Sequence, residues 1–188
     1  MKAIVYRRYG SPDVLECDEI EKPAPGDDEV LIKVRAASIN PLDRHIMRGR
    51  PKFLRIAFGL HKPKIRPGRD VAGQVEAVGR NVTQFKPGDE VFGVCLGAYA
   101  EFVCASASAL VRKPDNVTFE QAAAVPIAAL TALQGLRDKG RIQAGQKVLI
   151  NGASGGVGTF AAPNDLAICT ANVPTPPDAP LIRTFCPA

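Results

Sequence analysis

The stretch VLINGASGGVG, residues 148–158, decides the fold of this chain. An aliphatic run ends there in a glycine-rich loop, which is how a nucleotide-binding βαβ unit begins. Gly155 allows the backbone to approach a pyrophosphate, and Gly158 allows the next helix to pack close to the strand. The N-terminus of that helix offers free N–H groups to the phosphates. The stretch predicts a dinucleotide site whose cofactor-binding residues are Ser154, Gly155, Gly156, Val157 and Gly158.

The sequence departs from this pattern soon after the loop. Pro163 falls inside the second turn of the expected helix, and no second βα unit can be recognised. Residues 162–188 contain six prolines, few charges and no helical or strand period. We expect an irregular or disordered tail there, with a packed tail as the alternative, and a strand at 148–151 that lacks parallel neighbours. Asp178 has the spacing of a ribose-binding acid but stands among prolines, so it is not assigned that role.

Composition sets broad limits on the class of protein. The 188 residues are 46% hydrophobic, enough for a sizeable core. The net charge of +5 permits anionic partners without requiring them. No apolar run approaches the roughly 20 residues that span a bilayer, and the first residues lack the pattern of a secretory signal. The five cysteines form no CxxC pair, so we expect reduced thiols in a cytoplasmic protein.

The first part of the chain has the pattern of a β-barrel. Short apolar or alternating runs are separated by glycine and proline turns. Asn40-Pro41 predicts a short helix that ends at Gly49, because Asn caps helices and Pro suits the first helical position. The expected strands are residues 3–6, 30–36, 71–78, 90–92, 98–104 and 110–112.

The character of the sequence changes near Pro114. Thr118 and Gln121 have the spacing of a capping box, and the Ala-rich helix that follows is expected to break at Pro126. A second helix is predicted over residues 128–139. The predicted organisation is a barrel domain at 1–117, the start of a nucleotide-binding domain at 118–161 and a Pro-rich irregular tail at 162–188.

Five motifs follow one another along the chain. They are SINPLD (38–43), GRDVAG (68–73), FKPGDEV (85–91), AVP (124–126) and ASGGVG (153–158). In this order they resemble the medium-chain dehydrogenase/reductase superfamily, in its zinc-independent quinone oxidoreductase branch, and the resemblance covers about residues 1–161.

The resemblance implies a mixed α/β chain. A chaperonin-10-like β-barrel catalytic domain would be followed by the first strand, glycine loop and helix start of an incomplete Rossmann domain. It also implies NADPH-dependent hydride transfer to a small-molecule substrate, either a quinone or an α,β-unsaturated carbonyl compound. No specific nucleic acid partner and no membrane span are expected, and a homodimer is compatible with it.

The motifs also bear on zinc. Zinc enzymes of this superfamily carry a Cys where this chain has Asn40, a His-Glu pair at Arg69-Asp70, and a third ligand near Ile127. Asn, Arg and aliphatic side chains do not form the Cys/His cage that zinc requires. We therefore expect no metal site.

Three residues take roles from the resemblance. Asn40 is expected to be the catalytic residue, near the nicotinamide and the substrate carbonyl; its alternative role is a helix cap. Thr131 is expected beside the nicotinamide carboxamide; its alternative is a hydroxyl bonded to a carbonyl one turn earlier. Asp43 is expected to anchor its loop through hydrogen bonds.

Residues 44–69 form a basic segment with nine Lys or Arg and no acid. One interpretation is attraction of an anionic ligand, a membrane surface or RNA. The other is a solvated loop whose apolar residues cover the barrel.

Two functions stay open on sequence grounds. The first is an NADPH-dependent reductase in which Asn40 stabilises a developing oxyanion. The second is a catalytically inactive truncated remnant, or a barrel that acts as a binding module without a complete cofactor site. Because no second half of the nucleotide fold can be recognised, weak or absent NADPH binding is expected for this chain.

Overall fold

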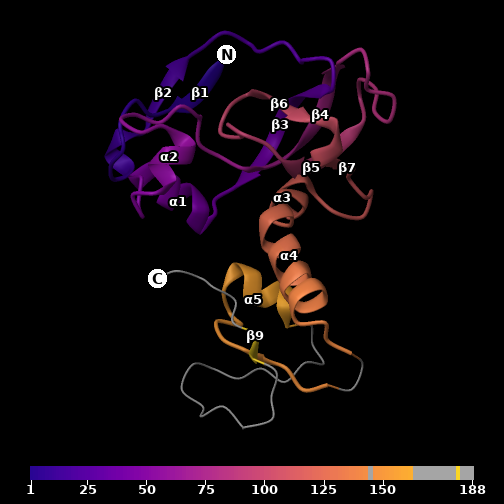
Figure 1. Ribbon diagram of the computed structural model, residues 1–188. Coiled ribbons are helices and arrows are strands. Elements are labelled where there is room, and N and C mark those ends of the chain that lie inside the picture. The colour runs from indigo at the N-terminus through magenta and orange to yellow at the C-terminus, as the bar shows by residue number, and fades with distance from the viewer. Residues whose placement is uncertain (144–145, 163–180, 183–188) are drawn as a thin grey trace. The chain divides into compact units, whose positions relative to one another are not determined.

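The computed structural model describes residues 1–143, 146–162 and 181–182 (Figure 1). The chain divides into two units, Met1–Pro126 and Ile127–Ala188. The first unit extends to Pro126 because α3 (Phe119–Ala123) packs against the sheet of that unit. Its Ala122 and Ala123 are buried against Ala72.

An antiparallel sheet of five strands organises the first unit. The order β6-β3-β4-β5-β7 places the two longest strands, β3 and β4, next to each other. Near its start each has a run of consecutive buried residues, 30–32 in β3 and 70–73 in β4, and the residues that follow alternate between exposed and more buried positions. The strands are β3 (Glu29–Ser38), β4 (Asp70–Val78), β5 (Glu90–Val94), β6 (Phe102–Ser106) and β7 (Leu110–Arg112).

The sheet curls around one core, as the barrel-like spacing of the sequence predicts. Val103 from the edge strand β6 and Leu110 from the opposite edge strand β7 belong to the same buried cluster. Ile32, Val71 and Val91 complete its centre with essentially no exposed surface. Burial of such side chains stabilises the fold by about 1.5–3 kcal/mol each.

A smaller lobe precedes the main sheet in sequence. The strands β1 (Lys2–Val5) and β2 (Glu16–Glu19) pair antiparallel, with a short helix η1 (Pro12–Val14) between them. Tyr6 and Val14 of this lobe pack against Met47 of α1 (Pro41–Arg48). The other short helices of the unit are α2 (Leu54–Phe58) and η2 (Ala107–Ala109).

The predicted helix boundaries of the first unit are confirmed. Asn40 is the N-cap of α1, Pro41 occupies its first turn, and Gly49 ends it in the left-handed region at φ 57°. At α3, the Gln121 N–H donates to Thr118 Oγ1 at 3.2 Å, and the Thr118 N–H donates to Gln121 Oε1 at 2.9 Å. This is the predicted capping box.

The second unit is built around β8 (Leu149–Ile150). Val148 and Ile150 are buried with Ala132 and Ala161, which come from the flanking helices. The predicted helix over 128–139 consists of α4 (Pro126–Leu133) continued by the π-helical turn η3 (Gln134–Lys139). After the glycine loop, α5 (Gly156–Ala161) ends just before Pro163, because a residue that precedes proline is disfavoured in helical geometry.

One expectation about this unit is wrong. The strand was expected to lack parallel neighbours, but β8 pairs in parallel with β9 (Leu181–Ile182), Leu149 opposite Leu181. The proline-rich composition of the tail gave no indication of this strand, which forms a two-stranded sheet with β8. The rest of that tail, with Pro163, Cys169, Asp178 and Cys186, lies outside the described residues.

Candidate active site

Asn40 lies in the short connection between the end of β3 and the start of α1. Its amide nitrogen donates to Asp70 Oδ2 at 3.0 Å and to Ser38 Oγ at 3.3 Å. The Ser38 hydroxyl also donates to Asp70 Oδ2, at 2.9 Å. Asp70 is completely buried and Asn40 is 9% exposed. The register of the sheet explains the meeting, because Ser38 and Asp70 are direct partners in the β3–β4 pair.

Asp43 joins this network from the first turn of α1. Its Oδ2 accepts the Asn40 N–H at 2.8 Å, which closes a capping box between the two residues. The Tyr99 hydroxyl donates to the same oxygen at 3.2 Å and also contacts the Ser38 carbonyl oxygen at 3.1 Å. Asp43 thus anchors its loop through hydrogen bonds.

Burial raises the pKa values of the Asp43 carboxyl and the Tyr99 phenol. It raises the pKa of Asp43, although the hydrogen bonds from Asn40 and Tyr99 and the charge of Arg69 act in the opposite direction. Burial also raises the pKa of the Tyr99 phenol, and the neighbouring carboxylate of Asp43 adds to that effect. The phenol therefore stays protonated and available as a hydrogen-bond donor at neutral pH.

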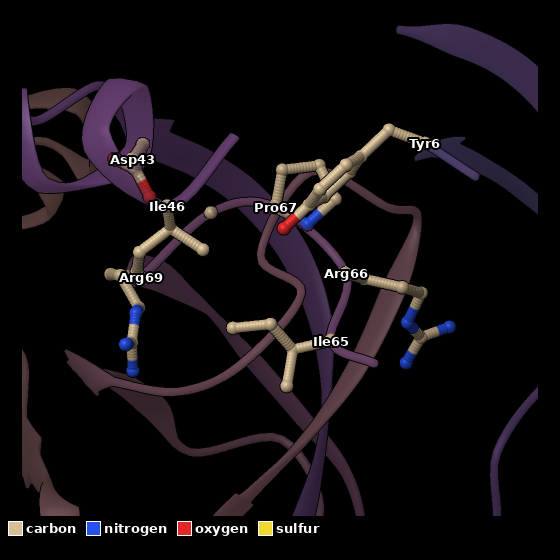
Figure 2. Close-up of a pocket in the computed structure, with 8 residues that line it drawn as sticks. Tyr6, Asp43, Ile46, Ile65, Arg66, Pro67 and Arg69 are labelled. Carbon is tan, nitrogen blue, oxygen red and sulfur yellow. The ribbon is translucent and has the colours of Figure 1, made fainter. Parts of the chain in front are cut away.

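Arg69 directly precedes Asp70 in the sequence. Its guanidinium carbon lies 5.3 Å from the centre of the Phe58 ring, and its buried Nε has no hydrogen-bond partner among the described residues. Arg69 borders a cavity of about 10 Å³, large enough for about one water molecule (Figure 2). Tyr6 faces the same cavity, where burial raises its pKa to about 12.

The positions where zinc enzymes of the superfamily have their ligands hold other side chains here, and two of these side chains bond to each other. Asn40 and Asp70 are hydrogen-bonded to each other, and no group of three or more His, Cys, Asp or Glu side chains comes together in the described part of the chain. The absence of zinc stays a prediction. Elemental analysis of the purified protein tests it, and about one tightly held zinc ion per chain would contradict it.

The glycine loop of the second unit connects β8 to α5. Gly152 has a φ of 76°, and the Gly155 N–H donates to the Gly152 carbonyl oxygen at 2.9 Å, so the loop turns tightly. A Cβ at Gly158 would lie 2.1 Å from that same carbonyl oxygen. Gly158 is therefore needed for close packing of helix and loop, as the sequence predicts.

The outer side of the loop is open. Ser154, Gly155 and Gly156 are exposed, and a Cβ at Gly156 would meet no atom within 4 Å. Exposed backbone with free space above it suits the approach of a phosphate group. Val157, by contrast, faces the buried cluster of the unit.

Thr131 makes the local bond that was the alternative to a cofactor contact. Its hydroxyl donates to the Ile127 carbonyl oxygen at 2.6 Å, one turn earlier in α4. Its role beside a nicotinamide stays a prediction.

The structure adds Ser38, Asp70 and Tyr99 to the residues that the sequence singled out around Asn40. One signal in the sequence pointed to Asp70: a carboxylate stands directly before the apolar run of β4. Ser38 and Tyr99 gave no such signal, because 61 residues separate them along the chain.

The first unit matches a known domain family. Residues 26–115 match the alcohol dehydrogenase GroES-like domain. Quinone oxidoreductase from Sus scrofa is 41% identical over 166 residues, which cover 86% of this chain and 48% of that protein. Over most of its length the chain is similar to the quinone oxidoreductases of the medium-chain dehydrogenase/reductase superfamily.

Solved structures of the superfamily agree with this assignment. The quinone oxidoreductase from Coxiella burnetii has a TM-score of 0.76 at 36% identity, covering 86% of this chain and 51% of that one. The Escherichia coli quinone oxidoreductase complexed with NADPH has a TM-score of 0.74 at 31% identity, over 86% and 48%. The predicted fold class, a GroES-like domain followed by the start of a Rossmann sheet, is thereby confirmed.

The match covers only part of each relative. The chain spans about half the length of the curated relatives it matches. No helix among the described residues has the length and apolarity needed to cross a membrane.

Proposed function

We propose that the protein is an NADPH-dependent reductase of quinones or α,β-unsaturated carbonyl compounds, for which this chain supplies the GroES-like domain and the glycine loop. The observation that carries the proposal is the buried network in which Asp70 and Ser38 hold the amide of Asn40. A fixed, partly desolvated N–H donor is what a developing oxyanion or enolate needs.

The geometry restricts how Asn40 can act. Both amide N–H groups have acceptors in this structure, at 3.0 Å on Asp70 and at 3.3 Å on Ser38. The longer contact is the weaker of the two. We propose that a substrate carbonyl oxygen competes for the N–H that points to Ser38, while Asp70 keeps the amide in place.

The nicotinamide, when bound, supplies the hydride. The open backbone at Ser154, Gly155 and Gly156 supports a role of this loop in holding the pyrophosphate, with Val157 and Gly158 packing beneath it. Thr131 would give up its bond to the Ile127 carbonyl oxygen to reach the carboxamide.

The test is NADPH oxidation by the purified protein with a quinone and with an enone. Asn40→Ala is expected to lower kcat/KM about 10²-fold, the usual effect of removing an oxyanion donor. Ser38→Ala, which removes the competing hydroxyl, is expected to retain more activity than Asn40→Ala. Asn81→Ala is the matched control, since Asn81 is exposed and bonds to Asp28 instead.

Circular dichroism and thermal unfolding establish that each variant is folded. Loss of activity in Asn40→Ala alone supports the proposal. An absence of NADPH-dependent turnover with both substrate classes would contradict it and favour a binding module.

A further inference from the structure

A groove of about 310 Å³ lies on the N-terminal lobe. None of its lining residues belongs to the Asn40 network. It is formed by the turn after β1, the end of α1 and the beginning of α2, which are neighbouring elements (Figure 1). We call it the arginine groove. Its lining residues are Tyr9, Gly10, Ser11, Arg48, Arg50 and Arg55.

The cations of the arginine groove form no ion pair within the part of the chain that the structure describes. The side chains of Arg48 and Arg50 make no hydrogen bond or ion pair with any described residue, whereas Arg7 and Arg80 elsewhere in the unit each bond to a carboxylate. The whole segment 44–69 contains no acid. Asp13 is not part of the lining, but its carboxylate accepts a hydrogen bond from the hydroxyl of the lining residue Ser11 at 2.7 Å.

The third guanidinium is held in place on the wall of the groove. Arg55 Nε donates to the Gly49 carbonyl oxygen at 3.1 Å, and its guanidinium carbon lies 4.7 Å from the centre of the Tyr9 ring. The Tyr9 hydroxyl in turn donates to the Gly59 carbonyl oxygen. The two terminal nitrogens of Arg55 have no partner among the described residues, so its donors are ordered but unused.

We propose that the arginine groove binds a phosphate monoester dianion. Guanidinium groups pair with phosphate oxygens in a bidentate manner, and a dianion with three acceptor oxygens can engage three of them. A single carboxylate has too few oxygens and too little charge to satisfy the groove. The proposal is independent of the reductase activity.

The phosphate could belong to a soluble molecule or to a lipid headgroup. Phe53, Ile56 and Leu60 flank the groove in sequence and are 66%, 78% and 60% exposed, which is the combination of cations and apolar side chains that an anionic lipid surface favours. The experiment therefore needs one arm for each source.

Binding to the purified chain is measured by calorimetry with inorganic phosphate and glycerol 3-phosphate, and by co-sedimentation with vesicles of phosphatidylcholine with or without phosphatidic acid. Acetate is the monocarboxylate comparison. The double variant Arg48→Ala/Arg50→Ala is expected to bind phosphate at least about tenfold more weakly, because charge-assisted hydrogen bonds are lost. The single variant Arg50→Ala changes an exposed residue and gives a test that does not depend on the folding of the double variant.

The matched control is Arg7→Ala/Arg80→Ala, which removes the same charge from exposed positions outside the groove. Binding of either phosphate source that the groove variants weaken and the control does not supports the proposal; the arm that responds identifies the source. Equal loss in both double variants, equal binding of acetate, or no binding of any phosphate probe would overturn it.

Discussion

At the scale of single residues, Asp70 is the acceptor on which the candidate site depends. Its carboxylate is fully buried and receives hydrogen bonds from Ser38 and Asn40. A buried charge of this kind persists only when its neighbours supply donors. Removing it would leave the buried amide of Asn40 without its closer acceptor.

We expect Asp70→Ala to lower the free energy of unfolding by about 2–4 kcal/mol, since an orphaned buried hydrogen-bond network is among the most destabilising changes. Urea unfolding measures it. The control, Asp27→Ala, breaks only the exposed pair with Arg80 and is expected to change stability by less than about 1 kcal/mol. Similar losses in the two variants would show that the network adds no special stability.

The second prediction at this scale concerns the buried thiol of Cys95 and the stability of the protein at alkaline pH. Burial, followed by the charge of Asp70, raises the pKa of its thiol from 9.0 to about 12. Because the folded-state pKa is raised, the stability contribution is fully present below pH 9 and is lost as pH rises toward 12. Between these values unfolding releases a proton, so stability falls by about 1.4 kcal/mol per pH unit from this group.

Cys95→Ala is expected to flatten that part of the stability profile, measured by urea unfolding between pH 8 and 11. Tyr6, whose pKa is also raised to about 12, contributes a separate slope that the variant keeps. In the folded wild type at pH 8, a thiol reagent should modify the exposed Cys17 well before the buried Cys95. An unchanged alkaline profile in Cys95→Ala would contradict the assignment.

At the scale of elements, two glycines of the strand–loop–helix in the second unit differ in the space around them. Gly158 is buried, and a side chain there would collide with the loop backbone, whereas Gly156 faces open space. Both positions are helical, so backbone strain does not distinguish them.

We expect Gly158→Ala to destabilise the second unit, because the Gly152 carbonyl oxygen would have to move, and Gly156→Ala to leave stability unchanged or slightly raised. If the loop holds a pyrophosphate as proposed, Gly156→Ala should nevertheless weaken NADPH binding. Thermal unfolding and NADPH fluorescence titration measure the two effects. Equal stability of the two variants would refute the packing role of Gly158.

At the scale of the whole molecule, the two units have separate cores. The main cluster around Ile32 and Val91 lies within the first unit, and the cluster of Val148, Ile150 and Ala161 lies within the second. A unit with its own core can fold independently.

We therefore expect the fragment 1–126 to unfold cooperatively in urea and to give a dispersed amide NMR spectrum. A fragment that stops at residue 113 lacks α3 and leaves Ala72 uncovered, so it should be less stable. Equal stability of the two fragments would mean that α3 is not part of the first unit's fold.

Local features of this protein follow from its sequence alone. The glycine loop, the caps at Asn40 and Thr118 and the break at Pro126 each depend on residues within a few positions of one another. The energetics of such features is local: a side chain satisfies a nearby backbone group, or a glycine or proline restricts its own turn. The ordered motifs then carried the fold class through family resemblance.

Only the tertiary structure decided what surrounds Asn40. The β3–β4 register brings Ser38 to Asp70, and Tyr99 reaches Asp43 across 56 positions of the chain. The pairing of β8 with β9 and the meeting of Arg48 with Arg55 and Tyr9 are likewise long-range or depend on how a loop folds back. A register shift of one residue would turn each strand side chain to the opposite face, and that choice is made by the packing of the whole core.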